Sequence, residues 1–245
     1  IYIQNQKRKN FMATYAFTDL HGQYELWRQI KEFCQPDDKL YFLGDAADRG
    51  SDGVRIMVEL LADPRVTYLK GNHEFFIENF FFNNATEETL KMWTKNGGEP
   101  TQKALIDLPD KELHTLIQQI KDLPYTATYI NKKSEVIYMS HSGYYVDLTQ
   151  ISKLDQNWYK LLLLQDRDHI GHPNSFKPEY INYIVHGHTP VQYIQEMIGL
   201  PKTLPLNPLG YDNGKIGLDL CSIISGTAAL LNLDTLESIL FTIKK

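Results

Sequence analysis

Five short polar segments each follow a run of apolar and β-branched residues, and this repeated order constrains the fold more than any other feature of the chain. Such runs predict buried strands, and the polar residues directly after them fall in loops at the end of a sheet. Loops held on a rigid sheet edge can aim carboxylates, imidazoles and amides into a single cleft. The runs are residues 13–18, 40–43, 66–69, 136–139 and 181–185, and the segments are 19–22 (DLHG), 44–50 (GDAADRG), 71–74 (GNHE), 140–143 (SHSG) and 187–189 (GHT).

The first third of the chain alternates strands with helices. Helices are predicted near residues 23–33, 53–61 and 73–82. In the first of them, Leu26, Ile30 and Phe33 recur at helical spacing and form the expected buried stripe. This βαβαβα order predicts an α/β fold whose first strands are parallel and joined by right-handed crossovers.

The rest of the chain carries a helical insertion and a β-rich end. Residues 86–121 are more polar and helical in pattern, and we expect a cap of three short helices there. Two strands joined by a turn at residues 131–134 follow, and then a helix near residues 155–164. A long surface loop rich in proline is expected at residues 198–213. The last predicted strands are residues 193–196, 215–220, 228–233 and 238–243.

Composition places the chain among ordinary globular proteins, because 42% of its residues are hydrophobic and 22% are charged. We expect one domain over residues 13–245 behind an N-terminal extension of residues 1–12. The net charge of −5 offers no basic surface for nucleic acid or anionic membrane. No run approaches the ~20 apolar residues of a membrane span, and the first ten residues lack the apolar core of a secretory signal. Cys34 and Cys221 are isolated and indicate free buried thiols, which suits the cytoplasm.

The polar segments contain the donor atoms of a two-metal site. Asp19 and His21 stand two residues apart at a strand end, so both point to one side and can share a cation. Asp45 can bridge two cations through its two carboxylate oxygens. Oxygen and nitrogen donors without cysteine suit Mn²⁺, Fe, Zn²⁺ or Mg²⁺, and two such ions about 3.5–4 Å apart activate water for attack on a phosphoryl group. The candidate ligands are Asp19, His21, Asp45, Asn72, His141 and His188.

Other residues of these segments suit a reaction at phosphorus. Arg49 is placed to donate paired hydrogen bonds to phosphate oxygens, and Arg167, after a predicted helix, is a second candidate for the same task. His73, with Asp48 as its partner, is the candidate acid that protonates a leaving oxygen.

Three further histidines have less direct interpretations. The spacing of His169 and His172 also fits a metal site, but we interpret both as loop residues beside Arg167. His186 alternates with His188 along a strand, so we expect it to point to the opposite side and to be buried.

Taken together, DLHG, GDAADRG, GNHE, SHSG and GHTP resemble the phosphoprotein-phosphatase branch of the calcineurin-like metallophosphoesterases, in particular its small bacterial and phage members such as the lambda phage protein phosphatase. The resemblance covers residues 15–243 and implies a β-sandwich of mixed sheets flanked by helices. One difference is Asp219-Leu220-Cys221, where family members often carry Asp-Thr-Gly. The resemblance implies one metal on Asp19, His21 and Asp45, and another on Asp45, Asn72, His141 and His188.

The same resemblance implies roles for the remaining candidates. Arg49 and Arg167 would bind phosphate, and His73 with Asp48 would form the acid pair. Trp93 and residues 96–98 (NGG) resemble a segment that bacterial members place near the site.

The predicted function is a metal-dependent phosphatase that hydrolyses phosphomonoesters by direct attack of a hydroxide bound to two metals, most simply Mn²⁺. Phosphoserine and phosphothreonine on proteins are the expected substrates, with phosphotyrosine and small phosphoesters as further candidates. The alternatives are a diadenosine tetraphosphate hydrolase, in which the aromatic residues near 75–82 help to hold a nucleotide, and a non-catalytic metal-binding scaffold. A single-stranded nucleic acid ending in a 3′-phosphate is a weaker candidate, given the acidic balance.

Overall fold

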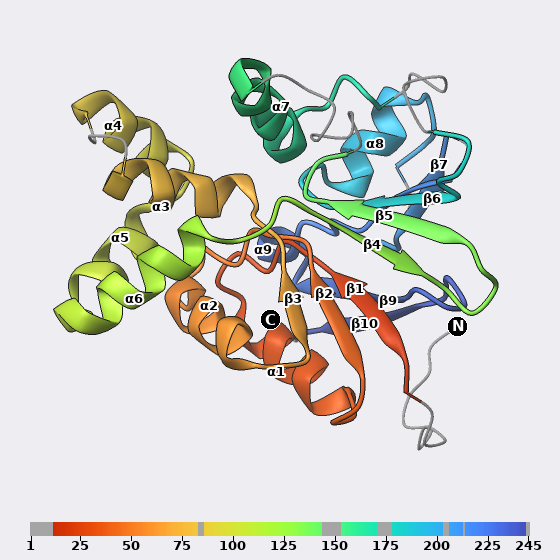
Figure 1. Cartoon of the computed structure of the whole chain (residues 1–245), viewed down its shortest axis with the longest axis horizontal. Helices are drawn as coiled ribbons and strands as arrows, with labels where there is room; N and C mark the ends of the chain where they lie inside the picture. The colour runs from red at the N-terminus through yellow and green to blue at the C-terminus, as the bar shows by residue number, and fades with distance from the viewer. Residues whose placement is uncertain are drawn as a thin grey trace.

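The computed structural model describes residues 12–82, 86–143, 153–170, 178–202, 206–212 and 214–243, except for the side chains of residues 153–157. Residues 1–11 of the expected N-terminal extension lie outside these ranges. The described residues form two five-stranded sheets with helices on their outer sides (Figure 1). Both sheets mix parallel and antiparallel strands, which confirms the predicted α/β architecture of mixed sheets flanked by helices.

The first sheet has the strand order β10-β9-β1-β2-β3. Its three parallel strands come from the βαβαβ pattern of the first third, and α1 (Tyr24–Phe33) and α2 (Gly53–Ala62) are the crossovers. The two C-terminal strands extend this sheet in antiparallel pairing. The strands are β1 (Thr14–Phe17), β2 (Lys39–Phe42), β3 (Val66–Tyr68), β9 (Thr227–Asn232) and β10 (Ser238–Thr242).

The second sheet has the order β4-β5-β6-β8-β7. The expected turn at residues 131–134 joins its first two strands, and α7 (Lys153–Gln165) lies between β5 and β6 in the sequence. The pairs β5/β6 and β6/β8 are parallel, whereas the strands at both edges are antiparallel to their neighbours. The strands are β4 (Thr126–Ile130), β5 (Val136–Ser140), β6 (Tyr183–His186), β7 (Leu209–Tyr211) and β8 (Lys215–Gly217).

Apolar side chains fill the space between the sheets and the outer side of the first sheet. Leu43 and Leu69 from the first sheet pack with Met139 and Val185 from the second. On the outer side, the Trp27 ring of α1 stacks on Phe17 of β1, with ring centroids 5.8 Å apart. The apolar stripe expected in the first helix is therefore the face that covers the sheet.

The expected helical cap corresponds to three helices that stand beside the sheets with α3 (Figure 1). A capping box between Thr86 and Thr89 begins the first of them, and a proline in the first turn begins the second. Trp93 is the large buried side chain of this group. The helices are α3 (Asn72–Phe82), α4 (Glu87–Lys95), α5 (Glu99–Ile106) and α6 (Asp110–Lys121).

Two predictions near the C-terminal end are wrong. The strand expected at residues 193–196 is part of α8 (Val191–Met197). Pro190 precedes this helix with φ −53°, and Val191 and Ile194 are buried at a spacing of three. This helical pattern prevailed over the strand preference of Tyr193, which is exposed. The loop expected at residues 198–213 contains β7, and a short helix, α9 (Ser222–Ser225), follows β8.

Within the described residues, no helix combines the length and the apolar character needed to cross a membrane.

Candidate metal centre

The loops after β1, β2 and β6 bend through left-handed backbone conformations that residues other than glycine rarely adopt. Asp19, His21, Asp45 and His188 have φ values of 51°, 43°, 64° and 62°. The first two loops are bonded together, because the N–H of Asp19 donates to Gly44 O at 3.0 Å and that of His21 donates to Asp45 O at 3.0 Å. Such backbone persists where its surroundings over-determine it, and it is common at functional sites.

A buried carboxylate fixes the Asp45 loop. Glu74 accepts the backbone N–H groups of Asp45 at 2.8 Å, Ala46 at 2.9 Å and Gly71 at 2.9 Å. It also accepts the hydroxyl of Tyr68 at 2.8 Å. Because Glu74 lies in the first turn of α3, these bonds tie the loop after β2 to the segment that carries Asn72.

Two imidazoles turn a nitrogen toward the centre. Nδ1 of His21 lies 2.9 Å from the carbonyl oxygen of Ala47, and Nδ1 of His141 lies 2.8 Å from that of Leu43. A carbonyl can only accept, so each Nδ1 carries a proton and Nε2 of the neutral ring keeps its lone pair. These two Nε2 atoms lie 3.6 and 3.4 Å from Oδ2 of Asp45.

Asn72 lies between the two histidines predicted to hold the second metal. Its Oδ1 is 2.9 Å from Nε2 of His141 and 3.0 Å from Nδ1 of His188. Donor atoms of Asp45, His141 and His188 all lie within 4.8 Å of one another, and those of His21, Asp45 and His73 do the same. Asp45 is common to both groups, which is the geometry that a bridging carboxylate needs.

Asp19 is close to the first group without being part of it. Its Oδ1 lies 3.9 Å from Nε2 of His21, while Oδ2 accepts the hydroxyl of Thr18 at 2.5 Å and the N–H of His188 at 3.0 Å. The combined donors are carboxylate, amide and imidazole without thiolate. This chemistry fits two divalent cations.

Buried acidic groups give the centre an excess of negative charge. Burial, followed by nearby carboxylates, raises the pKa of Asp19 well above its usual value, and burial raises the pKa of Asp219 to about 6. Burial alone lowers the pKa of His141, but the carboxylates of Asp45 and Asp19 raise it to about 9. A proton on His141 therefore neutralises part of the negative charge of these carboxylates. Bound cations would neutralise that charge in its place.

The predicted acid pair is in direct contact. Nδ1 of His73 lies 2.6 Å from Oδ2 of Asp48, and both residues are buried. The indole N–H of Trp93 donates to the same Oδ2 at 2.9 Å, and the N–H of Asp48 donates to the Thr101 hydroxyl at 2.9 Å. The cap helices α4 and α5 therefore hold the carboxylate that faces His73.

Arg49 reaches both groups of donors from an exposed position. Its Nη1 lies 2.6 Å from Nε2 of His21, and its Nη2 lies 3.1 Å from Nε2 of His73. Its backbone N–H donates to Gly97 O at 2.8 Å, so residues 96–98 lie beside the site. A Cβ on Gly97 would stand 2.8 Å from Cγ of Arg49, which leaves room for glycine alone.

Arg167 enters from the second sheet side, in the turn after α7. Burial, then His141 and then the positive charge of Arg167 lower the pKa of His188 well below its usual value, so the exposed Arg167 lies within electrostatic reach of that ring. His169 is buried in that turn, and His172 lies outside the described residues. His186 is fully buried, as the alternation along its strand predicts.

Two residues of the centre were given no role by the sequence. Glu74 belongs to the GNHE segment but binds backbone groups, and this function leaves no pattern in the chain. Asp219 contributes to the raised pKa of Asp19, and Asp45 contributes to the raised pKa of Asp219. The predicted strand of residues 215–220 enclosed Asp219, whereas β8 ends at Gly217, so its place after a strand is seen only in the structure.

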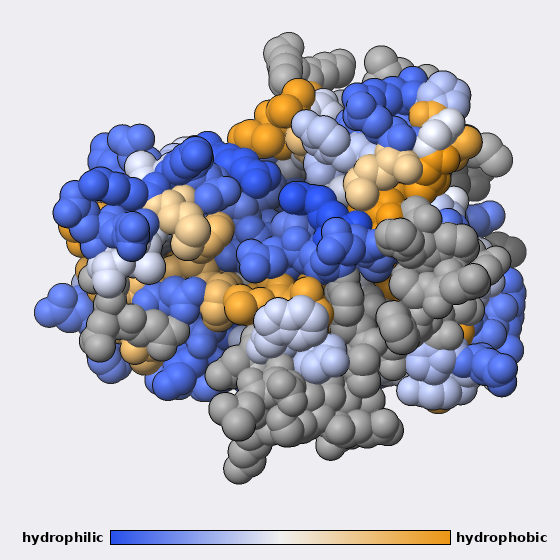
Figure 2. Space-filling model, turned by 90° about the horizontal axis from the view of Figure 1, so that it is seen from above, coloured by the Kyte–Doolittle hydropathy of each residue, from blue (hydrophilic) through white to orange (hydrophobic). Residues whose placement is uncertain are grey.

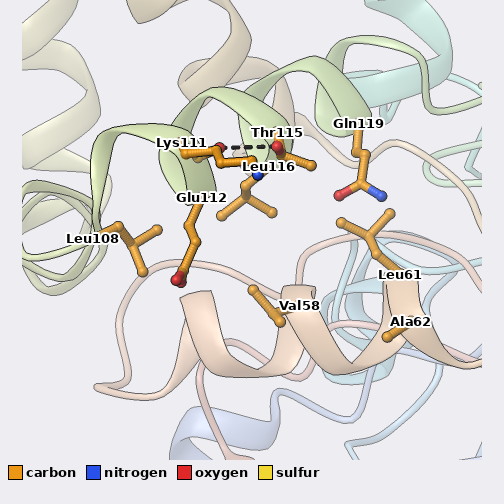
Figure 3. A pocket seen from close by; sticks show the side chains of 9 residues that line it. All are labelled: Val58, Leu61, Ala62, Leu108, Lys111, Glu112, Thr115, Leu116 and Gln119. Carbon is orange, nitrogen blue, oxygen red and sulfur yellow. Dashed lines mark hydrogen bonds between the residues drawn. The ribbon is translucent and has the colours of Figure 1, made fainter.

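One apolar groove among the described residues lies away from the candidate ligands. This groove of about 440 Å³ runs between α2 and α6, with Val58, Leu61 and Leu116 on its walls (Figure 3). It contains none of the candidate site residues. Figure 2 shows that the face seen from above is hydrophilic in the middle, with hydrophobic residues gathered at its sides.

Solved structures with this fold include several phosphatases. One, from a protein provisionally assigned as a diadenosine tetraphosphatase, has a TM-score of 0.61 at 13% identity and covers 97% of each chain. A serine/threonine phosphatase from Saccharomyces cerevisiae has a TM-score of 0.56 at 14% identity, over 96% of this chain and 81% of the other. At these identities the likeness concerns the fold alone.

Curated relatives match over short stretches. A symmetrical bis(5′-nucleosyl)-tetraphosphatase of Buchnera aphidicola is 36% identical over 67 residues, which is 26% of this chain and 24% of the relative. A protein named as a serine/threonine-protein phosphatase candidate of Caenorhabditis elegans is 35% identical over 63 residues, which is 23% of this chain and 17% of that protein. The chain thus spans a quarter or less of these relatives. The family model described as calcineurin-like phosphoesterase matches residues 12–203, and the chain therefore belongs to that family of phosphoester hydrolases.

Proposed function

We propose that the protein is a metal-dependent phosphatase acting on phosphoserine and phosphothreonine in proteins, with phosphotyrosine as a secondary substrate. The contact of 2.6 Å between His73 and Asp48 carries this proposal. An alkoxide is a poor leaving group and needs a positioned acid, whereas a phosphate leaving from an anhydride needs little protonation. A buried pair held by Trp93 beside the donor atoms is the arrangement expected for the first reaction.

Each residue of the centre has a proposed task. Two divalent cations, with Mn²⁺ preferred over Fe, Zn²⁺ or Mg²⁺, would supply an activated water and neutralise charge on the phosphoryl group. Arg49 and Arg167 would bind the phosphate oxygens. The proposed ligands are Asp19, His21 and Asp45 for one cation, and Asp45, Asn72, His141 and His188 for the other.

The contacts of Arg49 and His73 indicate how the proton is handled. Nε2 of His21 has one lone pair, so it cannot serve a cation and the N–H of Arg49 together. With that Nε2 holding a cation, Arg49 would be free to bind phosphate. Nδ1 of His73 faces Asp48, so Nε2 is the atom that would deliver the proton to the leaving oxygen. Asp48 fixes the ring in that orientation.

We further propose that residues 13–245 act as one catalytic domain, with residues 86–121 as its cap and residues 1–12 as an extension. The contacts of Trp93 with Asp48 and of Gly97 with Arg49 support a cap that works as part of the site.

A second candidate is hydrolysis of a dinucleotide polyphosphate. One comparison favours it: the short match to the Buchnera tetraphosphatase. The cap also contains a hollow of about 280 Å³ whose walls include Phe80, Phe81 and Trp93, and aromatic rings of this kind can stack on a base.

The deciding experiment compares kcat/KM for phosphoserine, phosphothreonine and phosphotyrosine peptides with that for diadenosine tetraphosphate in Mn²⁺ buffer. A clear preference for the peptides supports the protein phosphatase. A preference for the dinucleotide overturns it and makes the Phe80 hollow the place to mutate. A protein that binds metal and turns over neither the peptides nor the dinucleotide contradicts both candidates, and its metal site then serves another substrate.

The acid role of His73 has its own test. His73→Asn should slow hydrolysis of alkyl phosphates by about 10²–10⁴-fold and affect p-nitrophenyl phosphate much less, because nitrophenolate leaves without a proton. His114→Asn, at an exposed position on α6, is the matched control. Equal losses on both substrates would show that His73 is not the acid.

A further inference from the structure

A second group of buried polar residues lies outside the metal centre. His169, His186, Tyr211 and Lys215 are 4%, 0%, 8% and 2% exposed. They come from the turn after α7 and from the strands β6, β7 and β8 of the second sheet. None is used in the proposed reaction, although burying this many polar groups is costly unless each is bonded.

The Tyr211 hydroxyl links the two histidines of this group. Nδ1 of His186 lies 2.9 Å from the carbonyl oxygen of Gly187 and must donate to it, which leaves Nε2 as an acceptor. The Tyr211 hydroxyl, 2.7 Å from that Nε2, therefore donates its proton to His186. The Tyr211 oxygen also lies 3.4 Å from Nε2 of His169, whose Nδ1 lies 3.5 Å from Oδ2 of Asp166. Burial lowers the pKa of both histidines, in keeping with neutral rings.

His169 connects this chain of bonds to the turn that carries Arg167. Its carbonyl oxygen accepts Nζ of Lys215 at 2.6 Å, and its N–H donates to Asp166 at 3.3 Å. The N–H of Ile170 closes the turn on the Arg167 carbonyl at 3.0 Å. The turn is therefore tied to the sheet through His169, on the C-terminal side of Arg167.

The His169 ring also packs against the loop that follows His141. A Cβ on Gly143 would stand 2.8 Å from Cε1 of His169, so ring and backbone are in close contact. At the other end of the chain of bonds, Gly187 immediately precedes His188. The bonded group thus joins the loops of two proposed metal ligands to the turn of Arg167.

We propose that Tyr211 is a positioning residue that, through His169, holds Arg167 at the phosphate. This rests on the proposed function only in requiring Arg167 to bind substrate phosphate. Tyr211 touches neither substrate nor cation. Its hydroxyl links the His186 ring, which is bonded to Gly187 next to His188, to the His169 ring in the turn of Arg167. The hydroxyl thereby fixes the separation of these two rings.

Tyr211→Phe removes one oxygen and keeps the ring that packs with Ile170 and Ile194. We expect KM for p-nitrophenyl phosphate and the inhibition constant of inorganic phosphate each to rise about fivefold, the effect of one neutral hydrogen bond, with kcat within about twofold. Tyr193→Phe, at an exposed position on α8, should change neither. Unchanged phosphate inhibition in Tyr211→Phe overturns the proposal.

A double-mutant cycle separates positioning from general damage to the fold. In an Arg167→Ala background, Tyr211→Phe should have no further effect on phosphate inhibition, because the group it positions is gone. Additive effects overturn the proposal. Unaltered phosphate inhibition in Arg167→Ala alone instead contradicts the proposed role of Arg167. If Tyr211→Phe does not fold, Lys215→Met releases the His169 carbonyl and must produce the same change in KM without a change in kcat.

Discussion

The two sheets support the same centre by different means. Beneath the loops of the first sheet, Phe17, Trp27 and Phe42 form a continuous aromatic core in which the Phe17 and Phe42 centroids are 4.9 Å apart. The corresponding region of the second sheet contains His186 and Lys215, which are held by hydrogen bonds.

Apolar packing has no direction, so it gives stability without fixing single side-chain atoms. Hydrogen bonds fix orientation and contribute little net stability. We infer that the first sheet is the stable body of the protein and that the second sheet aims residues at the substrate. Changes beneath the first sheet should lower stability, whereas changes beneath the second should alter function in molecules that remain folded.

The largest expected effect is on Asp45, where both groups of donors meet. Asp45→Asn removes the bridging charge, so bound metal should fall, and kcat should drop by more than the roughly 10²–10⁴-fold contributed by one general acid. Metal content by mass spectrometry and kcat with p-nitrophenyl phosphate measure both. Asp37→Asn, at an exposed position, is the control. A variant that keeps both its metal and its rate would rule out a shared carboxylate.

The next effect is on stability and tests the aromatic core. Trp27→Ala empties a fully buried position against Phe17 and should lower the free energy of unfolding by about 3–5 kcal/mol. Urea unfolding measures this, and kcat per folded molecule should stay near that of the parent protein. Trp158→Ala, at an exposed position on α7, should lower the free energy of unfolding only slightly. A large loss of kcat with little change in stability would contradict the division between the sheets.

The first sheet was predictable because its signals are local. Each strand is an apolar run, and the predicted helices agree with α1, α2 and α3 to within a residue or two at their ends. Asp45 and His141 were candidate ligands because each follows a predicted strand, and the family resemblance assigned both to one metal. Their proposed roles remain predictions, although the structure brings the donors together.

The second sheet was less predictable because its contacts join distant residues. Tyr211 lies in a region rich in proline that gave no strand signal, and its partner His186 is 25 residues away. Tyr193 favoured a strand by its residue type, yet it lies in α8 because Val191 and Ile194 are the residues that are buried. Trp93 was associated with the site by resemblance, but its bond to Asp48 spans 45 residues.

A smaller effect tests the contact between the cap and the first sheet. Trp93→Phe keeps a ring against Gly98 and Phe80 but loses the N–H that Asp48 accepts. We expect kcat to fall about tenfold on alkyl phosphates and less on p-nitrophenyl phosphate, because Asp48 acts through His73. Trp158→Phe is the control. Equal losses on both substrates would assign Trp93 to packing alone.

The smallest effect lies on the surface of the first sheet, away from the chemistry. Glu59 of α2 accepts from Tyr24 at 2.9 Å, from Trp27 at 3.0 Å and from Lys31 at 3.0 Å. Burial raises the pKa of Glu59, but the Lys31 charge and the three donors outweigh burial and hold it below its usual value of 4.5. A depressed carboxyl pKa stabilises the fold above the unfolded value, and this stabilisation is lost as the pH falls through the folded value.

Glu59→Gln should therefore lower the free energy of unfolding by about 1 kcal/mol at neutral pH, and by less as the pH falls through the folded pKa of Glu59. Urea unfolding near pH 7 and near pH 3 measures the two differences, and kcat should not change. Glu112→Gln, at an exposed position on α6, should show neither effect. A difference of the same size at both pH values would mean that the geometry of the acceptor matters here and its charge does not. The hydrogen bonds of Glu59 would then contribute through their geometry, as the hydrogen bonds beneath the second sheet do. The difference between the two sheets would then rest on the aromatic core alone.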